Sequence, residues 1–550
     1  MCGIFAFIKS HLQNTITERL KKDLSDGWLL GSSRGPEHSA IRDLSCGMLG
    51  FHRLAINGLD ESSNQPINKS GCILICNGEI YNYKDLYKQL DITPKTNSDC
   101  EVIIDMYTNY GIEYTLQNLD GVFSFILIDE NCHEIFVARD PFGVRPMYYC
   151  FNDDGHCYAS EFKQLSYLCD LEKTETYGQF DPGTYTSYKI THEGPIELVY
   201  KNKVYAEFQL QQNYNFHPDR HFNVYHYQTF HNLSEAVKKR VETTDRPIAC
   251  LLSGGLDSSI IAALVRQHMP KNTVLETYSI GMTGAEDFTY AQKVADHIGS
   301  NHTQVVVSEE DFFNAIPEVI YNLSSYDTTT VRASVGNYLI GKYISENSFA
   351  KVIFNGDGSD ELMGGYMYFH YCPNTMAFDN ECKRLLKNIH HFDGLRSDRC
   401  ISPHGLESRT PFLDRSFVHG YLTIPSHIRN HAHNMQMEKF LLRSSISTYG
   451  NNLLPQEVLW RKKEAFSDGV SSEKKSWYEI IQEKVDDPIV ENITYNEPTT
   501  AEQRYYRSIF EKHYKGCGSI IPYFWMPQFC DAKDSSARTL DVYKKFEHDE

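Results

Sequence analysis

Short apolar runs alternate with helical patterns through the C-terminal two-thirds of the chain. The runs lie at 248–252, 274–280, 303–307 and 351–355, and each is long enough for one buried strand. Amphipathic or apolar helical segments fill the intervals between them. This alternation predicts a doubly wound parallel α/β sheet with added helices. Ligands bind such sheets beyond the carboxyl ends of the strands, so we expect a ligand-binding site at the loops that follow these runs.

The N-terminal third has a different pattern, with many short strands and turns. An apolar strand opens the chain at Ile4, and further strands are predicted at 51–56, 72–76 and 122–128. This density of short strands predicts stacked β-sheets with a few flanking helices. The sequence therefore divides into two domains of α/β class.

The boundary between the two domains is predicted from a loss of apolar periodicity. Residues 200–230 are aromatic and polar, with Asn, Gln and His where periodic apolar residues would stand. We expect a linker near 205–225, which gives domains at 2–205 and 225–550. A helix over 231–240 then leads into the strand that begins at Pro247.

Composition narrows the classes of partner. The 550 residues include 53 basic and 72 acidic side chains, a net charge of −19, which argues against nucleic acid or an anionic membrane as a partner. An anionic small substrate would need positive charge supplied locally. No run reaches about 18 apolar residues, and no basic segment with an apolar core opens the chain. The 15 scattered cysteines fit a reduced, cytoplasmic protein.

The loop S-G-G-L-D-S-S at 253–259 carries the strongest chemical signal. It joins the first apolar run to a helix, so unpaired N–H groups and the helix dipole converge above it and favour an anion. The spacing and lysine of the Walker loop are absent. Asp257 would repel phosphate unless a Mg²⁺ ion lay between them. The alternative interpretation is an ordinary strand-to-helix turn.

A second glycine-rich acidic turn follows the last apolar run. It reads N-G-D-G-S-D-E at 355–361, and a third short stretch, Ser279 to Gly281, ends another run. The carboxyl ends of parallel strands share one edge, so we expect these stretches to meet the loop at 253–259. Taken alone, the turn at 355–361 could also be a surface turn.

Cys2 becomes the first residue once the initiator methionine is removed. Its thiol would then sit beside a free α-amine with an ordinary pKa of about 7.7–8.0, so one residue could supply a nucleophile and its base. Asn77-Gly78, Arg53 and Asp99 follow in the chain. Singly, these residues are typical of a hairpin turn, a surface strand and a helix cap.

The ordered motifs C-G-I, H-R-L-A-I, N-G-E-I-Y-N, S-D-C-E and R-D-P-F-G resemble the class II glutamine amidotransferases. That family consists of N-terminal-nucleophile hydrolases with an αββα sandwich. The resemblance implies that Cys2 attacks the glutamine side-chain amide, while Asn77 and Gly78 form the oxyanion hole. Arg53 would hold the glutamine carboxylate and Asp99 its ammonium. The implied glutamine-binding residues are Arg53, Leu54, Ala55, Ile56, Asn57, Asn77, Gly78, Glu79 and Asp99.

The loop at 253–259 resembles the S-G-G-x-D-S loop of the PP-loop ATP pyrophosphatases. Further segments at 326–334, 364–366, 405–414, 460–469 and 525–527 resemble the glutamine-dependent asparagine synthetases. The implied ATP-binding residues are Leu252, Ser253, Gly254, Gly255, Asp257, Ser258, Ile280, Asn355 and Gly356. The implied Mg²⁺ ligands are Asp257 and Asp360, and the implied aspartate-binding residues are Thr329, Thr330 and Arg332. Lys463 would lie near the phosphates, and Asp357 would handle protons as ammonia attacks.

This resemblance implies a ligase that consumes ATP, L-aspartate, L-glutamine and water. It would yield AMP, diphosphate, L-asparagine and L-glutamate through β-aspartyl-AMP and channelled ammonia. Two alternatives stay open: a related synthetase that amidates another carboxylate, and a scaffold without turnover. A homodimer is also left open.

The chain departs from the family pattern at two positions of the turn 355–361. The usual G-E-G-S-D-E has Asp357 in place of its first Glu, which shortens the reach of the carboxylate by roughly 1.5 Å. Asn355 stands where Ser is common. We predict that activity is retained, because backbone contact would tolerate Asn355 and a carboxylate survives at Asp357.

Overall fold

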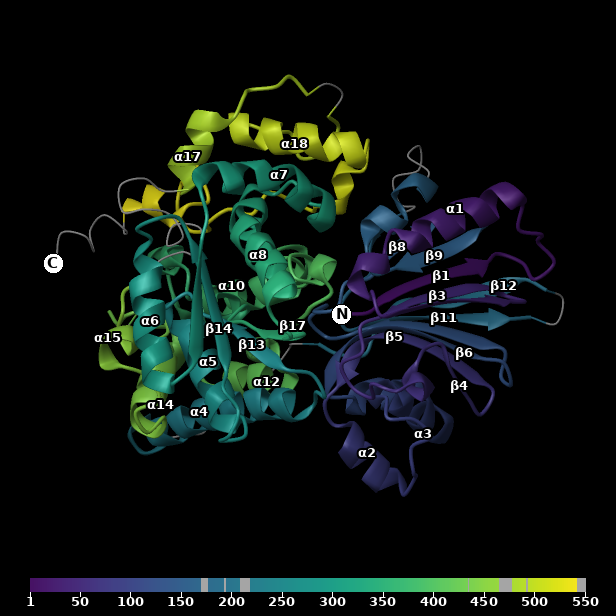
Figure 1. The fold of residues 1–550 in the computed structure, drawn as a ribbon, viewed down its shortest axis with the longest axis horizontal. Helices are drawn as coiled ribbons and strands as arrows, with labels where there is room; N and C mark the ends of the chain where they lie inside the picture. Colours follow the sequence, from purple (N-terminus) through teal and green to yellow (C-terminus); the bar gives the residue numbers. More distant parts are fainter. Residues whose placement is uncertain are drawn as a thin grey trace.

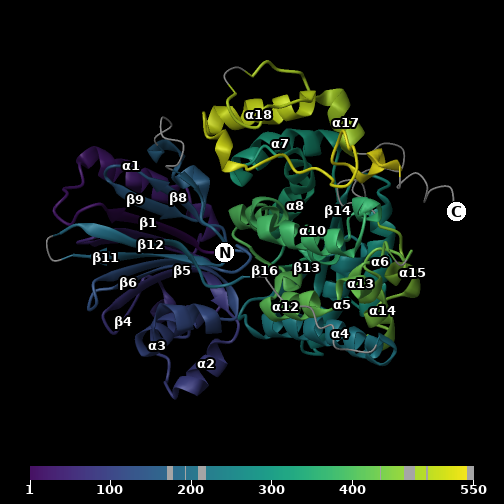
Figure 2. The same cartoon turned by 180° about the vertical axis from the view of Figure 1, so that it is seen from behind.

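Two halves lie side by side in the computed structural model (Figures 1 and 2). The structure describes residues 1–169, 177–191, 194–207, 218–433, 435–463, 477–490 and 493–541. Stacked sheets form the N-terminal half, and a sheet surrounded by helices forms the C-terminal half. The N-terminus lies at the junction of the two halves (Figure 1). Residues at the start of the chain therefore face both.

The N-terminal half contains two six-stranded antiparallel sheets. The first has the order β10-β8-β9-β1-β3-β2 and the second the order β12-β11-β7-β6-β5-β4. The first sheet consists of β1 (Gly3–Lys9), β2 (His38–Leu44), β3 (Gly47–Arg53), β8 (Tyr148–Phe151), β9 (Gly155–Ala159) and β10 (Tyr177–Gln179). The second consists of β4 (Ile67–Lys69), β5 (Cys72–Ile80), β6 (Gly121–Asp129), β7 (Glu134–Arg139), β11 (Thr184–Ile190) and β12 (Ile196–Val204).

Both faces of β1 are buried as far as Ile8, which explains why this strand is apolar until its last residue, Lys9. On β1, Ile4 and Ala6 pack between the sheets against Ile73 of β5, whereas Phe5 points to the outer face. Helix α1 (Glu18–Leu29) covers that outer face, and α2 (Tyr83–Leu90) and α3 (Val102–Asn118) cover the outer face of the second sheet. The predicted αββα sandwich is confirmed.

The C-terminal half is built on a five-stranded parallel sheet with the order β15-β14-β13-β16-β17. Its strands are β13 (Ile248–Leu251), β14 (Glu276–Gly281), β15 (Asn301–Val306), β16 (Val352–Phe354) and β17 (Glu407–Arg409). The first four confirm the strands predicted from the apolar runs. The fifth was missed, because its residues are Glu, Ser and Arg, and it is buried through ion pairs instead of apolar contacts.

Helices cover both faces of this sheet, as a doubly wound fold requires. Helices α7 (Glu309–Leu323) and α8 (Thr328–Asn347) pack on one face, and α4 (Pro218–Glu242), α5 (Leu256–His268) and α6 (Glu286–Ile298) on the other. Helices α17 (Trp477–Lys484) and α18 (Ala501–His513) lie over α7 in both views (Figures 1 and 2). The other α-helices of the described residues are α9 (Ser359–Met363), α10 (Thr375–Asn388), α11 (Asp393–Arg399), α12 (Arg415–Thr423), α13 (Ser426–Arg429), α14 (Phe440–Tyr449) and α15 (Gln456–Leu459).

The predicted linker falls partly outside the described residues, which omit 208–217. Strand β12 ends at Val204 and α4 begins at Pro218, so the helix predicted over 231–240 is longer than expected. The motif at 460–469 is described only as far as Lys463. Over the described part of the chain, no helix is both long enough and apolar enough to cross a membrane.

Candidate active sites

Cys2 stands immediately before β1, at the end of the first sheet that faces the other half. Its thiol donates to the carbonyl of Leu54, 3.5 Å away, and burial raises the pKa of that thiol. The structure includes Met1, whose ammonium donates to the Leu406 carbonyl at 3.0 Å. Burial lowers the pKa of this ammonium to about 5. The thiol of Cys2 thus lies beside the segment that begins at Leu54, whereas the α-amine of Cys2 exists only after Met1 is removed.

Asn77 lies on β5 with 1 % of its surface exposed. Neither its side-chain nitrogen nor its side-chain oxygen has a hydrogen-bond partner among the described residues. Leaving a buried amide unpaired costs about 1–3 kcal/mol, so such a group is rare unless a ligand uses it. At the adjacent Gly78 a Cβ would lie 2.4 Å from the Val122 carbonyl oxygen, so a residue with a side chain does not fit at this position. Both features suit the predicted oxyanion hole.

Asp99 lies in the turn before α3, beside the part of β5 that carries Asn77 and Gly78. We call these three residues the glutamine corner. The Oδ2 of Asp99 accepts from the N–H of Ile80 at 2.7 Å, which places it beside the end of β5. Burial raises the pKa of Asp99 to about 6, although the Ile80 N–H works in the opposite direction. Glu79 pairs with Arg409 of β17 at 3.5 Å, and burial together with the charge of Asp99 raises the pKa of Glu79 well above its usual range.

The other predicted glutamine-binding residues follow the end of β3. The guanidinium of Arg53 donates to the Asp60 carbonyl at 3.0 Å and to Asn64 Oδ1 at 2.7 Å, so it organises the loop beside the corner. Ala55 donates its N–H to Glu37 Oε2 at 2.7 Å. The segment Leu54, Ala55, Ile56 and Asn57 is buried.

The loop after β13 makes a tight turn into α5. Gly254 has a φ of 78°, and a Cβ there would lie 2.5 Å from the N atom of Ala291, so only glycine fits against α6. Ser258 Oγ accepts from the N–H of Ser253 at 3.2 Å and lies 3.0 Å from Ser253 Oγ. These bonds, together with that from the Gly255 N–H to Ser253 Oγ at 3.3 Å, hold a tight turn at the start of α5.

A cavity of about 230 Å³ lies beyond the carboxyl ends of the strands. The predicted residues that line it are Leu252, Ser253, Gly255, Asp257, Ser258, Ile280, Thr329, Asn355, Gly356, Asp357, Asp360 and Lys463. Gly254, Thr330 and Arg332 are not among its lining residues. The two glycine turns touch, because a Cβ on Gly356 would lie 2.8 Å from the Cβ of Asp257, and Ser359 Oγ donates to Asp257 Oδ1 at 2.8 Å.

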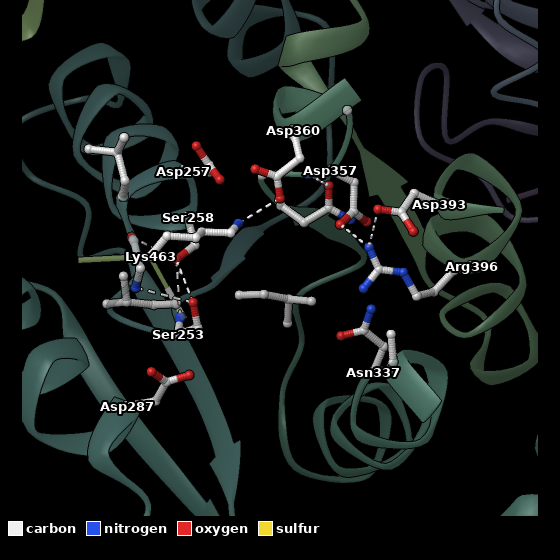
Figure 3. Close-up of a pocket in the computed structure, with 18 of the residues that line it drawn as sticks. Ser253, Asp257, Ser258, Asp287, Asn337, Asp357, Asp360, Asp393, Arg396 and Lys463 are labelled. Atoms are coloured by element: carbon white, nitrogen blue, oxygen red, sulfur yellow. Dashed lines mark hydrogen bonds and ion pairs between the residues drawn. The ribbon is translucent and has the colours of Figure 1, made fainter. Parts of the chain in front are cut away.

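Two lysines neutralise the acidic side of this cavity. Lys439 Nζ lies 2.5 Å from Asp257 Oδ2 and 2.5 Å from Asp360 Oδ1. Lys463 Nζ lies 2.6 Å from Asp360 Oδ2 (Figure 3). Burial would raise the pKa of Asp360, but the two ammonium groups outweigh it and lower that pKa. The same contacts raise the pKa of Lys463 against its burial. Lys439 was missed by sequence reasoning; the only signal was that an acidic chain needs local cations to bind an anion.

The opposite wall holds Asp357 and the helix α11. Arg396 Nη2 lies 2.9 Å from Asp357 Oδ1 and 3.0 Å from Asp393 Oδ2, and Figure 3 shows its guanidinium between the two carboxylates. Burial raises the pKa of Asp357, although Arg396 acts in the other direction. The amide of Asn355 donates to Ser397 Oγ at 2.7 Å, so this side chain turns away and leaves its backbone to the cavity.

Comparison with known proteins agrees with this geometry. The family model described as asparagine synthase matches residues 230–378 and 371–535, and the glutamine amidotransferase domain matches residues 1–206. The glutamine-hydrolysing asparagine synthetase of Gallus gallus is 42% identical over 574 residues, covering 99% of both chains. That of Homo sapiens is 41% identical over 519 residues, covering 90% of this chain and 91% of its own. The chain belongs to the asparagine synthetase family.

The placement of Arg332 differs from what the resemblance to asparagine synthetases implied. Its guanidinium donates to Glu502 Oε1 at 2.7 Å and to Asp534 Oδ1 at 2.7 Å, so its donors are taken by α18 and the C-terminal segment. Thr330 lies in the first turn of α8 and donates its hydroxyl to Oδ2 of Asp327, the residue that caps this helix, at 2.7 Å. Of the three candidates, Thr329 alone lines the cavity, and Arg396 is an arginine there that sequence reasoning missed.

Proposed function

We propose that this chain makes L-asparagine from L-aspartate, with ATP as the activating substrate and L-glutamine as the nitrogen donor. The observation that carries the proposal is the division of the cavity into two ends. Asp257 of the loop at 253–259 lies with Asp360 and the two lysines at one end, and Arg396 with Asp357 lies on the other wall. One end suits a metal-bound polyphosphate and the other suits a small acid.

The glutamine site lies in a domain that we place at residues 2–205. Cys2, freed by loss of Met1, attacks the side-chain amide of glutamine and forms a thioester as ammonia leaves. The unpaired amide of Asn77 and the N–H of Gly78 donate to the oxyanion of the tetrahedral intermediate. Arg53 holds the glutamine carboxylate and Asp99 its ammonium, and water then hydrolyses the thioester to glutamate.

ATP binds in the second domain, which we place at residues 225–550. The loop at 253–259 holds the phosphates, Leu252 and Ile280 contact the adenosine, and Asn355 and Gly356 contribute backbone groups. Two carboxylates without a full cage of protein ligands fit Mg²⁺, which is commonly bound by one or two carboxylates together with substrate phosphates. Asp257 and Asp360 would hold this ion, which would neutralise the phosphates. Lys439 and Lys463 add positive charge at the same end.

Aspartate binds beside α11, with Thr329 as one contact. Because Arg332 is engaged through its Nε and both terminal nitrogens, we assign a substrate carboxylate to Arg396, which lines the cavity. Both ion pairs of Arg396 use its Nη2, and its Nε has no hydrogen-bond partner among the described residues. The β-carboxylate attacks the α-phosphorus of ATP, giving β-aspartyl-AMP and diphosphate. Ammonia then attacks the acyl carbon, AMP leaves, and Asp357 accepts a proton from the attacking nitrogen. An internal passage for ammonia follows from chemistry, because ammonia in water near neutral pH is mostly protonated and not nucleophilic.

The decisive experiment measures asparagine and AMP formed from aspartate, MgATP and either glutamine or an ammonium salt, together with the mass of the N-terminal peptide. We expect product from both nitrogen sources and a chain that starts at Cys2. The variant Cys2→Ala should lose synthesis from glutamine and keep synthesis from ammonium. Loss of both reactions in this variant would refute the two-site mechanism.

A second candidate function is amidation of a different carboxylic acid. The shorter acid at Asp357 is the observation that favours it, because it changes the reach of a group beside the acceptor. Diphosphate release measured across a panel of dicarboxylic acids separates the two, and a scaffold without turnover would release none. We further propose that the chain works in the cytoplasm on small molecules, without nucleic acid or membrane partners, and that a homodimer is its assembly state.

A further inference from the structure

Arg34 lies between the two halves and contacts both. It ends a short turn of the N-terminal half and has no exposed surface. Its Nε donates to the backbone carbonyl of Cys2 at 2.8 Å. Its two terminal nitrogens donate to the two carboxylate oxygens of Asp398, at 2.7 and 3.1 Å. Arg34 therefore connects the backbone of the nucleophile to the C-terminal half.

Asp398 belongs to α11, and its side chain is 1% exposed. A bidentate contact between a guanidinium and a carboxylate fixes the plane of the guanidinium as well as its distance. Ser402 Oγ supports the same arrangement, at 2.9 Å from Arg34 Nη1. With its plane fixed in this way, the Nε–H of Arg34 is directed at the Cys2 carbonyl. Glu161 of the N-terminal half also lies 3.5 Å from Arg34 Nη1, but the shorter contacts to the guanidinium come from Asp398 and Ser402 of the C-terminal half.

We propose that Asp398 is a positioning residue of the glutamine site, acting through Arg34 on the backbone of Cys2. This inference rests on the proposed role of Cys2 as the nucleophile. A residue at the start of a chain is poorly held unless something ties it down, and a catalytic group must be held to within about 0.5 Å. Removal of Met1 also removes the contact between Met1 and Leu406. The tie from Asp398 through Arg34 survives that removal.

The same short helix borders the ATP cavity, because Arg396 contacts Asp357 two residues before Asp398. General damage to α11 would therefore harm both reactions, whereas a positioning role predicts loss of one. Synthesis from ammonium reports on the cavity alone. Hydrolysis of glutamine reports on Cys2.

The test is the variant Asp398→Asn, which keeps the size of the side chain and removes its charge. We expect kcat for glutamine hydrolysis to fall about 10- to 100-fold, the scale expected when a reacting group is misplaced by about 1 Å. KM for glutamine should change little, since Arg53 and Asp99 do not contact Asp398. Labelling of Cys2 by a diazoketone analogue of glutamine should slow to the same extent. Synthesis from ammonium should be kept; an equal loss in both reactions, or in neither, would overturn the proposal.

Two further variants separate positioning from stability. In Arg34→Met/Asp398→Asn no charge of the pair is left unpaired, so the unfolding midpoint should recover relative to Asp398→Asn. Glutamine hydrolysis should stay low, because Cys2 has lost its donor; recovery of hydrolysis would contradict the inference. Asp120→Asn is the matched control, since Asp120 pairs with Lys239 across the halves at 2.5 Å without reaching Cys2. A wild-type chain that hydrolyses glutamine but amidates another acid would overturn the proposed product and leave this inference intact.

Discussion

The glutamine corner and the ATP cavity differ in the charge of the polar groups that they bury. At the corner, the buried amide of Asn77 has no partner among the described residues. In the cavity, Asp257 and Asp360 are close to one another and share the ammonium of Lys439. An unpaired neutral amide costs a few kcal/mol at most, whereas an unpaired buried carboxylate costs far more. A buried neutral donor can therefore remain unpaired in the free protein, but buried charges need counter-ions from the protein.

This difference matches the ligands that each site is proposed to take. Glutamine presents a neutral amide, and negative charge appears on its oxygen only as the thiol attacks, which is where unpaired donors are most useful. ATP arrives fully charged, so the cavity needs positive groups before and after binding. Substitutions at the two sites should therefore affect different reactions.

Asn77→Ala should lower kcat for glutamine hydrolysis by about 10²–10³, the usual loss for one oxyanion donor. Synthesis from ammonium should not change, because Asn77 is on β5 of the other half. The fold should not be weakened, since the amide makes no hydrogen bond that the substitution would break. Steady-state kinetics with each nitrogen source and a thermal unfolding midpoint check all three. A marked loss of stability would show that Asn77 has a structural role.

Lys439→Gln should lower kcat/KM for MgATP in the ammonium reaction by roughly 30-fold or more. Losing one member of a buried, hydrogen-bonded charge pair costs at least about 2 kcal/mol, and every 1.4 kcal/mol is a factor of about ten. Glutamine hydrolysis without ATP should be unaffected. Lys293→Gln is the control, because Lys293 pairs with Glu457 at 2.6 Å on the surface, where ion pairs contribute little. If both lysine variants behave alike, the cavity does not depend on its internal counter-ion.

The pH dependence of glutamine binding should follow Asp99. Its pKa is raised to about 6 by burial, so the carboxylate that would hold the glutamine ammonium is protonated as pH falls through that value. At about one pH unit below this pKa only about a tenth is ionised, and KM for glutamine should rise about tenfold relative to neutral pH. The hydrolysis assay measured from about pH 5 to 8 checks this. Asp99→Asn should have a higher KM that no longer varies through this range; an unchanged profile would assign the titration to another group.

The strands at Ile4, 72–76 and 122–128 and the four apolar runs of the C-terminal half could be predicted because they are apolar in a run. Strand β2 is largely polar and could not be predicted, and β3 ends at Arg53, short of the strand predicted at 51–56. The loop at 253–259 was also predictable as a candidate anion site, because a Ser-Gly turn between a strand and a helix directs N–H groups and the helix dipole at one point. Strand β17 could not be predicted, because its charged residues Glu407 and Arg409 are buried as an ion pair, with Arg409 Nε 2.9 Å from Glu407 Oε1. Lys439 could not be predicted for a related reason. Lysine side chains are normally exposed, and the burial of Lys439 depends on two acids that are distant in the chain, Asp257 and Asp360. Asp398 has no local signal, because its role arises where the two halves meet.

The smallest effect is expected at Asp357, where this chain departs from its family. The carboxylate is held by Arg396 at 2.9 Å in a wall that also contains Asp393. Asp357→Glu extends the carboxylate by roughly 1.5 Å into this wall, so the ion pair must shift. We expect synthesis from ammonium to slow by a few-fold, with glutamine hydrolysis unchanged. Asn355→Ser, the other departure, is the matched control and should have no effect, because the Asn355 amide faces Ser397 and not the cavity. Faster synthesis in Asp357→Glu would instead show that the shorter acid limits proton transfer, and that Arg396 holds Asp357 too far from the attacking nitrogen.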